Sequence, residues 1–297
     1  MIKGLAITPP VLGRISIGKI IERNGKRLPE KDDQFSITSQ VQNREGWVSH
    51  PLDDVLRKKS ENNKIISIPI KVMFNDPDLN LRADYSLFDK TNGRPVCVGD
   101  GASCRRYTET GMQSLPCPSP DGCSFGKGLC KPYARLNVLI GDEDELGSFI
   151  FRTTGYNSIR TLTARLNYFK AVSGNLLSCL PLELRLRGKS TTQSHRSAIY
   201  YVDITIRDGM TLVDAITEAR GIHEHRLQIG HDQEALDAIA RTGFENGAFE
   251  ESEDEIPAVL EEFYPERSLS GGVSGEVGNN SLQSKLDKKS VMEHQAT

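Results

Sequence analysis

The chain has 297 residues, of which 37% are hydrophobic and 26% are charged, and its net charge is −3. This length fits one large domain or two ordinary ones, and the near-neutral charge excludes a uniformly basic nucleic-acid-binding protein. No apolar run approaches the roughly 20 residues that a membrane helix needs, and residues 1–14 lack the apolar core of a signal peptide. We therefore expect a cytoplasmic protein without membrane attachment.

The N-terminal half is predicted to be rich in strands. Asn24-Gly25 favours a two-residue hairpin turn with residues 18–23 as one arm. Residues 64–73 alternate and are β-branched, and Pro69 among them predicts an edge strand because proline cannot donate a hydrogen bond to a sheet. Three further segments have the composition of strands: residues 81–90, 134–141 and 147–155.

The C-terminal half is predicted to begin with a long helix. Apolar residues recur at helical spacing across residues 158–172, with Ser158 as the expected N-cap and Gly174 as the terminating residue. Residues 181–189 and 197–207 then predict a hairpin with leucines on one face and charged residues on the other. Two more helices are expected, one that begins at Thr211 with a capping box and one over residues 232–241.

These elements predict an α+β fold, in which a mixed or antiparallel sheet is crossed by a long helix. We divide the chain into a core over residues 1–220 with a cysteine-rich insertion at residues 97–130, an acidic helical segment over residues 221–266, and a tail over residues 267–297. The tail is rich in Gly, Ser and Asn and poor in large apolar residues. Such a segment cannot offset its own ordering entropy, so we expect it to be disordered.

The acidic segment stands out against the region before it. Residues 221–266 carry 2 Lys or Arg against 13 Asp or Glu, whereas residues 151–220 carry 10 against 5. A charge run of this kind is typical of a solvated, partly disordered face. The alternative is an acidic segment that competes with nucleic acid or recruits a basic partner.

Five of the six cysteines lie within residues 97–130. Disulfides are disfavoured in a reducing compartment, so clustered cysteines in a cytosolic protein more often indicate a metal. Gly and Pro punctuate the segment, and it has few apolar side chains to bury. A metal would supply the cross-link that a core cannot, and the pattern therefore predicts a zinc knuckle in a loop.

The spacing leaves the ligand set open. Cys117, Cys123 and Cys130 are separated by five and six residues, which is looser than the usual zinc signature. The fourth ligand is Cys104, with Cys97 as the alternative. Ordinary reduced thiols or a redox pair are the interpretations without a metal. Because four thiolates leave no open coordination position, we expect the zinc to be structural rather than catalytic.

Catalytic signatures do not accompany the cluster. The chain has no phosphate-binding loop, no nucleophile elbow of the G-x-S-x-G type and no H-E-x-x-H helix. An enzyme is unsupported by these residues, and we expect a protein without catalytic activity.

Basic residues gather on the predicted helix and hairpin, with tyrosines among them. Such a surface could neutralise phosphates while the tyrosines stack on bases, or it could bind an acidic protein surface. A solvated sheet face is the plain structural alternative. The residues expected to contact a partner or DNA are Arg160, Arg165, Arg185, Arg187 and Lys189.

The order of motifs over residues 1–210 resembles a known family. A Cys-x-Gly-Asp-Gly turn at residues 97–101 is followed by Pro-Cys-Pro, two further cysteines, and the segments ARLNVLI, FRTTGYNSIRTL and PLELRLR. This combination is similar to the recombination directionality factor-like proteins of phages and mobile genetic elements. Cys104 and the long acidic C-terminus depart from the family pattern, and the cysteines that match it are Cys97, Cys117, Cys123 and Cys130.

The resemblance implies a zinc-containing accessory protein that binds a serine integrase on DNA and shifts it from integration toward excision. The alternatives are a single-stranded nucleic-acid-binding protein of a phage or plasmid operon and a metal-dependent hydrolase, a label carried by some bacterial homologues.

Overall fold

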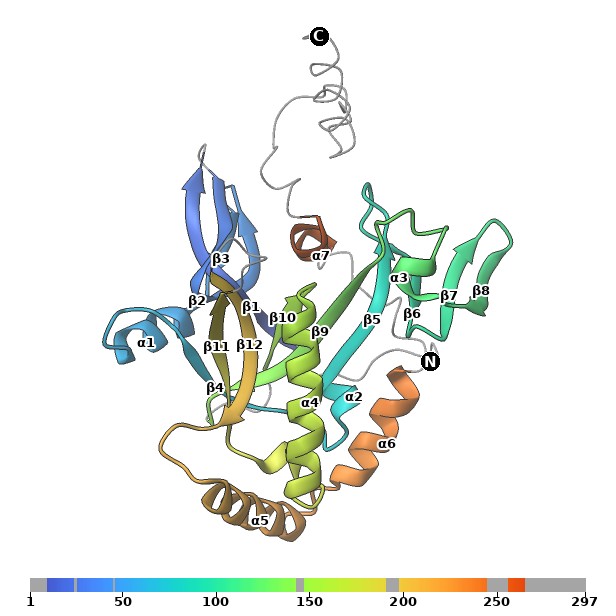
Figure 1. Cartoon of the computed structure of the whole chain (residues 1–297). Helices are drawn as coiled ribbons and strands as arrows, with labels where there is room; N and C mark the ends of the chain where they lie inside the picture. Colours follow the sequence, from blue (N-terminus) through green and yellow to red (C-terminus); the bar gives the residue numbers. More distant parts are fainter. Residues whose placement is uncertain are drawn as a thin grey trace, which may run out of the picture. The chain divides into compact units, whose positions relative to one another are not determined.

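The computed structural model describes residues 10–23, 26–44, 46–142, 147–190, 198–244 and 256–264, and these belong to one compact unit. The described residues combine twelve strands with seven α-helices, which confirms the predicted α+β class (Figure 1). The tail expected to be disordered lies outside the described residues.

The strands are β1 (Val11–Arg23), β2 (Lys26–Asn43), β3 (Gly46–Ser49), β4 (Ser67–Lys71), β5 (Leu81–Phe88), β6 (Pro95–Gly99), β7 (Ser103–Thr108), β8 (Gly111–Pro116), β9 (Lys131–Ile140), β10 (Ser148–Thr153), β11 (Leu182–Ser190) and β12 (Ala198–Ile206). The helices are α1 (Pro51–Lys59), α2 (Pro77–Asn80), α3 (Ser119–Gly122), α4 (Tyr156–Val172), α5 (Leu212–Gln228), α6 (Gln233–Phe244) and α7 (Ile256–Phe263).

The sheet is mixed, as predicted. Its main path runs β3-β2-β1-β10-β9-β5-β6-β7-β8, and the pairs β1–β10 and β2–β3 are parallel. A branch leaves β9 through β4 to β11 and β12. Both predicted hairpins are present: β1 and β2 pair out to Arg23 opposite Lys26, and β11 pairs with β12 along its whole length.

Pro69 does not mark a sheet edge, so that expectation is wrong. Strand β4 has β11 on one side and β9 on the other. The Pro69 carbonyl accepts a hydrogen bond from the Gly141 nitrogen at 2.9 Å, just beyond the end of β9. The nitrogen and carbonyl of a strand residue point toward the same neighbour, so the missing donor of Pro69 faces the end of β9 and leaves the pairing with β11 intact.

The core lies between the sheet and α4, the predicted long helix. Leu162 and Leu166 of α4 are fully buried, and they join Phe151 of β10 and Leu184 of β11 in one apolar cluster. Figure 1 shows α4 crossing in front of the central strands. Burial of this apolar stripe, at roughly 25 cal/mol per Å² of apolar surface, is the main stabilisation of the fold.

The beginning of α4 differs from the prediction. Gly155 occupies the N-cap position and makes no side-chain cap. Ser158 is instead inside the helix, where its Oγ accepts a hydrogen bond from the Val202 nitrogen at 3.0 Å. This serine therefore ties α4 to β12 rather than capping the helix.

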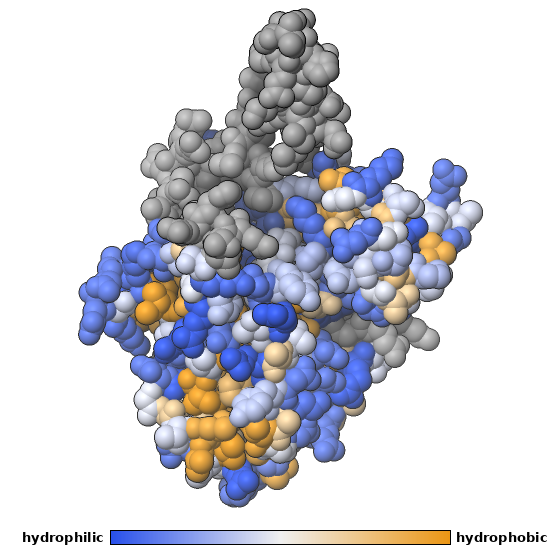
Figure 2. Space-filling model, viewed as in Figure 1, coloured by the Kyte–Doolittle hydropathy of each residue, from blue (hydrophilic) through white to orange (hydrophobic). Residues whose placement is uncertain are grey.

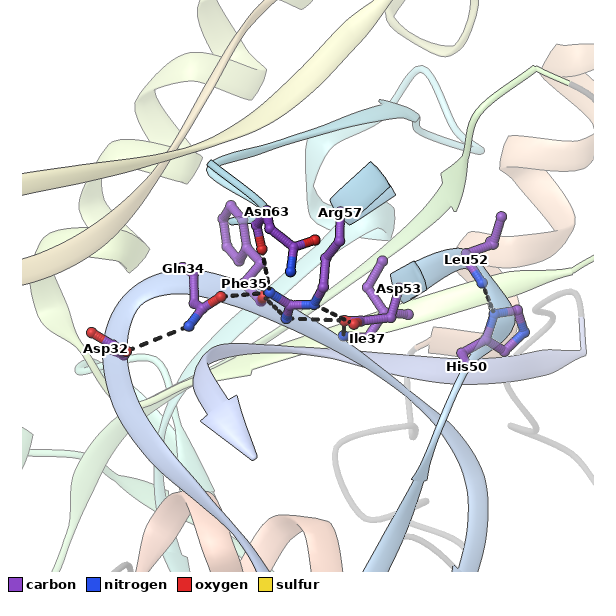
Figure 3. A network of polar contacts seen from close by, with 9 residues as sticks. All are labelled: Asp32, Gln34, Phe35, Ile37, His50, Leu52, Asp53, Arg57 and Asn63. Carbon is purple, nitrogen blue, oxygen red and sulfur yellow. Dashed lines mark hydrogen bonds and ion pairs between the residues drawn. The ribbon is translucent and has the colours of Figure 1, made fainter. Parts of the chain in front are cut away.

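Helix α1 was not predicted, and a single arginine joins it to β2 (Figure 3). The Arg57 guanidinium pairs with Asp53 at 2.6 Å, donates to the Gln34 side chain at 2.5 Å and donates to the Phe35 carbonyl at 3.1 Å. Asp53 in turn accepts a hydrogen bond from the Ile37 nitrogen at 2.8 Å. The network closes on itself and fixes the orientation of α1 on the sheet.

Helices α5 and α6 confirm the two helices predicted after the hairpin. Thr211 and Asp214 form the expected capping box at the start of α5, and α6 covers the helix predicted at residues 232–241. Within the described ranges, no helix combines the length and apolar character required to cross a bilayer.

The acidic segment is more than a solvated face, which corrects the first interpretation of it. Helix α7 buries Val259 and Phe263 against Phe88 and Tyr133. The sequence interpretation considered only the negative charge of this segment and overlooked the short apolar stripe of α7, which packs on the sheet.

Candidate metal centre and interaction surface

Residues 95–130, here called the cysteine module, form a β-meander rather than the loop expected from their Gly and Pro content. Strands β6, β7 and β8 pair antiparallel in sequence order, and the single turn of α3 follows before the chain returns to β9. The Gly- and Pro-rich composition did not indicate these strands, which are held by cross-strand pairing.

Two cysteines lie on one face of this meander. Cys97 of β6 stands opposite Arg106 of β7, and Cys104 of β7 stands opposite Gly99 of β6. Paired residues share a face of the sheet, so both thiols point to the same side. A Cβ on Gly99 would lie 2.6 Å from the Cys104 Cβ, so glycine is required for this approach.

The other three cysteines sit where elements end. Cys117 follows β8, and its nitrogen donates to the Ala102 carbonyl at 2.9 Å. Cys123 caps the C-terminus of α3. Cys130 precedes β9 and packs on Gly126, where a Cβ would come within 2.9 Å of the Cys130 Cβ. Tight turns therefore carry all three thiols back toward the meander.

The pKa shifts show that the thiols share one neighbourhood. Burial, together with the neighbouring Cys97, raises the pKa of Cys104 to about 11. Burial also raises the pKa of Cys130 to about 11, and the charges at the four other module cysteines contribute. Such thiols are protonated at neutral pH, so a metal would have to displace their protons to bind.

The arrangement is a cluster of thiols rather than a finished metal site. Within the described residues, no three His, Cys, Asp or Glu side chains are placed as a ready set of metal ligands. All six cysteines are described, and none forms a disulfide. The donor chemistry fits zinc, since the module carries five thiols, two on paired strands and three at the ends of elements. Because Cys97 and Cys104 lie side by side, the choice between them stays a prediction.

Arg106 belongs to the same cluster and was not predicted from the sequence. Its guanidinium lies 4.0 Å from the Phe125 ring centroid, and its Nη2 lies 4.0 Å from the Cys123 Sγ. Burial lowers the pKa of Arg106, but hydrogen bonding to Cys97 and nearby thiolate charge outweigh it and raise the pKa. A zinc ion held by four thiolates carries excess negative charge, which a neighbouring guanidinium would offset. Only the strand register, which places Arg106 opposite Cys97, reveals that this arginine lies beside the thiols.

The predicted basic surface is more neutral than its sequence suggests. Arg165 of α4 lies 3.0 Å from Asp203 of β12, and Arg187 of β11 lies 3.5 Å from the other oxygen of the same carboxylate. Asp203 is buried, while both arginines are about half exposed. Arg165 and Arg187 therefore already neutralise the buried Asp203 carboxylate in the protein without a partner.

The same neutralisation occurs further along β11. Arg185 pairs with the buried Glu183, whose carboxylate also accepts from the Thr205 hydroxyl at 3.1 Å. Lys189 donates to the Asn157 side chain at 2.8 Å. Arg185 and Lys189 therefore hold the hairpin and the start of α4 together as well as contributing charge.

The exposed face of α4 is the part of this surface best suited to a partner. Tyr156, Arg160 and Tyr168 all occupy exposed positions of α4, and the two tyrosines are 60% and 50% exposed. The helix contains no Asp or Glu. Figure 2 shows the nearby β11–β12 surface as hydrophilic, whereas apolar residues gather near α5. Exposed Tyr and Arg are the residues that dominate protein interfaces.

The comparison with known families is consistent with the cysteine module and the α4 surface belonging to one domain. The model of the recombination directionality factor-like family matches residues 12–207, and the chain belongs to this family. That range contains the whole cysteine module, α4, β11 and β12, and it ends before α5. No curated protein and no solved structure matches the chain. The family gives the protein an accessory role in the DNA recombination of phages and mobile elements.

Proposed function

We propose that the protein is a zinc-stabilised partner of a serine integrase, which it redirects from integration toward excision without strand chemistry of its own. The observation that carries the proposal is the family match, because it spans both the cysteine module and the tyrosine- and arginine-bearing face of α4. The cytoplasm is the compartment in which such a partner acts.

The zinc proposal rests on the thiol cluster. Cys117, Cys123 and Cys130 with Cys104, or with Cys97 in its place, would hold the ion. The zinc would cross-link a module whose α3 has no buried residue and whose β8 is almost wholly exposed. Its contribution would be to keep the meander and its turns in one conformation.

Metal content tests this proposal directly. Elemental analysis of the purified chain should give about one zinc per molecule, as expected for one tetrahedral thiolate site. Cys123→Ser should remove it, whereas Cys179→Ser is the matched control because Cys179 lies in the apolar core away from the module. Comparing Cys97→Ser with Cys104→Ser would identify the fourth ligand. A folded wild-type chain free of metal would contradict the zinc proposal.

The binding surface calls for substitutions that leave the ion pairs alone. Arg185 and Arg187 neutralise the buried Glu183 and Asp203, so changing them would confound binding with stability. Arg160→Glu with Tyr168→Ala changes only exposed positions of α4 and should reduce capture of a serine integrase by at least about tenfold, as expected when a Tyr and an Arg anchor are lost.

Arg220→Glu serves as the control, since Arg220 is an exposed arginine on α5 outside the matched range. Equal capture by both variants would place the interface elsewhere. Salt-dependent binding to single-stranded DNA, with no capture of the integrase, would favour the nucleic-acid-binding alternative.

A further inference from the structure

Helix α7 docks on the family domain although it lies outside the range that the family model matches. In Figure 1 it lies over the end of β10, which it contacts. It contacts residues within the matched range, and we call the following seven the α7-docking surface: Arg14, Trp47, Phe88, Gly93, Lys131, Tyr133 and Thr154.

The first part of the docking is apolar. Val259 and Phe263 are fully buried against Phe88 and Tyr133, and the Phe263 ring lies edge-on to Phe88 with 4.9 Å between centroids. Ile256 packs against the turn between β5 and β6. A Cβ added at Gly93 in this turn would lie 2.5 Å from the Ile256 Cγ2. Positions 256, 259 and 263 follow the i, i+3, i+7 spacing of a helix recognised through one face.

The second part is electrostatic. Both carboxylate oxygens of Glu261 accept from the Trp47 Nε1 at 2.9 Å, and the Arg14 guanidinium stacks 3.5 Å above the Trp47 ring while its Nη2 lies 3.6 Å from Glu261. Glu262 accepts from the Thr154 nitrogen at 2.9 Å. Glu261 and Glu262 thus contact donors from β1, from β3 and from the residue that follows β10.

The end of the helix is held as well. Lys131 donates to the Phe263 carbonyl at 3.1 Å, and the Tyr264 hydroxyl donates to the Phe88 carbonyl at 2.7 Å. A cation at a helix C-terminus is favourable to the helix dipole. An eight-residue helix is marginal by itself, so α7 depends on this surface for its structure.

We propose that the α7-docking surface is a binding site for acidic amphipathic helices, that α7 occupies it as a built-in competitor, and that a partner protein's helix of the same chemistry displaces α7. The surface offers apolar, cationic and indole groups in one place, and α7 presents the matching stripe and acids. Because α7 belongs to the same chain as the surface, a partner helix must compete with an intramolecular contact. The proposal depends on neither zinc nor the integrase.

Trp47 provides the readout, since it is the only tryptophan of the chain and is 5% exposed beneath Arg14 and Glu261. Its emission should shift to longer wavelength when α7 leaves. The probe is a synthetic peptide of residues 254–266 with a scrambled peptide as its control.

Glu261→Gln with Glu262→Gln in the full chain should release α7 and red-shift Trp47. The wild-type peptide added in trans should then restore the original emission, with an affinity at least about tenfold higher for this variant than for the wild-type chain, whose own α7 competes.

Gly93→Ala separates docking from general destabilisation. It should red-shift Trp47 as well, but the peptide should not restore the emission because the same clash with Ile256 excludes it. Gly209→Ala is the matched control: Gly209 also has a positive φ, of +79°, but a Cβ there meets nothing within 4 Å. It should leave Trp47 unchanged.

Hydrogen exchange on the wild-type chain keeps the proposal testable if a variant fails to fold. The amides of α7 should exchange faster than those of β9, through local opening. Exchange of α7 only through global unfolding, or failure of the peptide to bind the Glu261→Gln, Glu262→Gln chain, would overturn the proposal. A Trp47 response to duplex DNA in place of the peptide would overturn the assignment of the ligand as a helix.

Discussion

The core around α4 and the cysteine module belong to the same sheet but differ sharply in how much apolar surface they bury. Leu162, Leu166 and Leu184 are fully buried among neighbours from several strands. In the module, Cys97, Val98, Gly99 and Cys104 are the buried residues of β6 and β7, and β8 and α3 bury none. Apolar burial alone can hold the first region, whereas the second has too little apolar surface to offset its ordering entropy.

The contrast indicates where the proposed zinc would contribute to stability. The module continues the main sheet through β5 and β6, so its strands have a template on one side. The β7–β8 hairpin and the turns after it lie further from the main sheet, and Cys117, Cys123 and Cys130 lie in or beside those turns. Stability of the core should therefore be independent of metal, while the conformation of the module should not be.

The largest expected effect is in the core. Leu166→Ala removes a fully buried side chain from the main cluster and should lower the free energy of unfolding by about 2–5 kcal/mol. Urea denaturation followed by far-UV circular dichroism measures this change. The loss should be the same with and without a chelator, and a chelator-dependent loss would break the separation between the two regions.

Metal removal should act on the module alone. In the presence of a strong chelator, or in Cys130→Ser, amide exchange over residues 95–130 should accelerate by at least about tenfold, as for a segment that opens locally, while α4 and β10 stay protected. Mass spectrometry of deuterium uptake measures both regions at once. Unchanged protection of the module would show that cross-strand pairing suffices to hold it.

A smaller effect is expected at the junction between α4 and β12. Asp203→Asn removes the buried anion shared by Arg165 and Arg187, and it should cost about 1–2 kcal/mol, because solvent screens both half-exposed arginines. A thermal melt of this variant, compared with one in which Arg187 alone is changed to Gln, measures the shared contribution. A cost close to that of Leu166→Ala would mean that ion pairs, not apolar burial, dominate the core.

The smallest effect concerns acid pH. The hydrogen bond from Arg207 lowers the pKa of Asp142. Its ionised form therefore stabilises the fold above the unfolded pKa of about 3.9, and this contribution is lost as the pH falls through the folded value. Asp142→Asn should flatten the loss of stability between pH 5 and pH 3, measured by urea midpoints across that range. An unchanged slope would assign the acid sensitivity to other carboxylates.

Local patterns predicted much of the fold. The alternating leucines of β11, the apolar stripe of α4 and the Thr211 capping box each specify their element without help from distant residues. Helix α1 was missed although Pro51 at its first turn and the acids after it are typical of a helix start.

The misses share a dependence on residues far apart in sequence. The bond from Trp47 to Glu261 spans 214 residues, so no local pattern could reveal that the acidic segment docks. Arg106 lies beside the thiols only through the register of β6 and β7. Arg165 reaches Asp203 only because α4 crosses β12. The types of the candidate residues were readable from the sequence, whereas their partners required the structure.

The most direct test of the proposed function is a recombination assay with purified components. A serine integrase from the same mobile element is incubated with excision substrates and, separately, with integration substrates, with and without this protein. We expect the protein to promote excision and suppress integration. Arg160→Glu with Tyr168→Ala should weaken both effects, whereas Arg220→Glu should not. Unchanged yields of both products, with a folded protein and an active integrase, would contradict the proposed function.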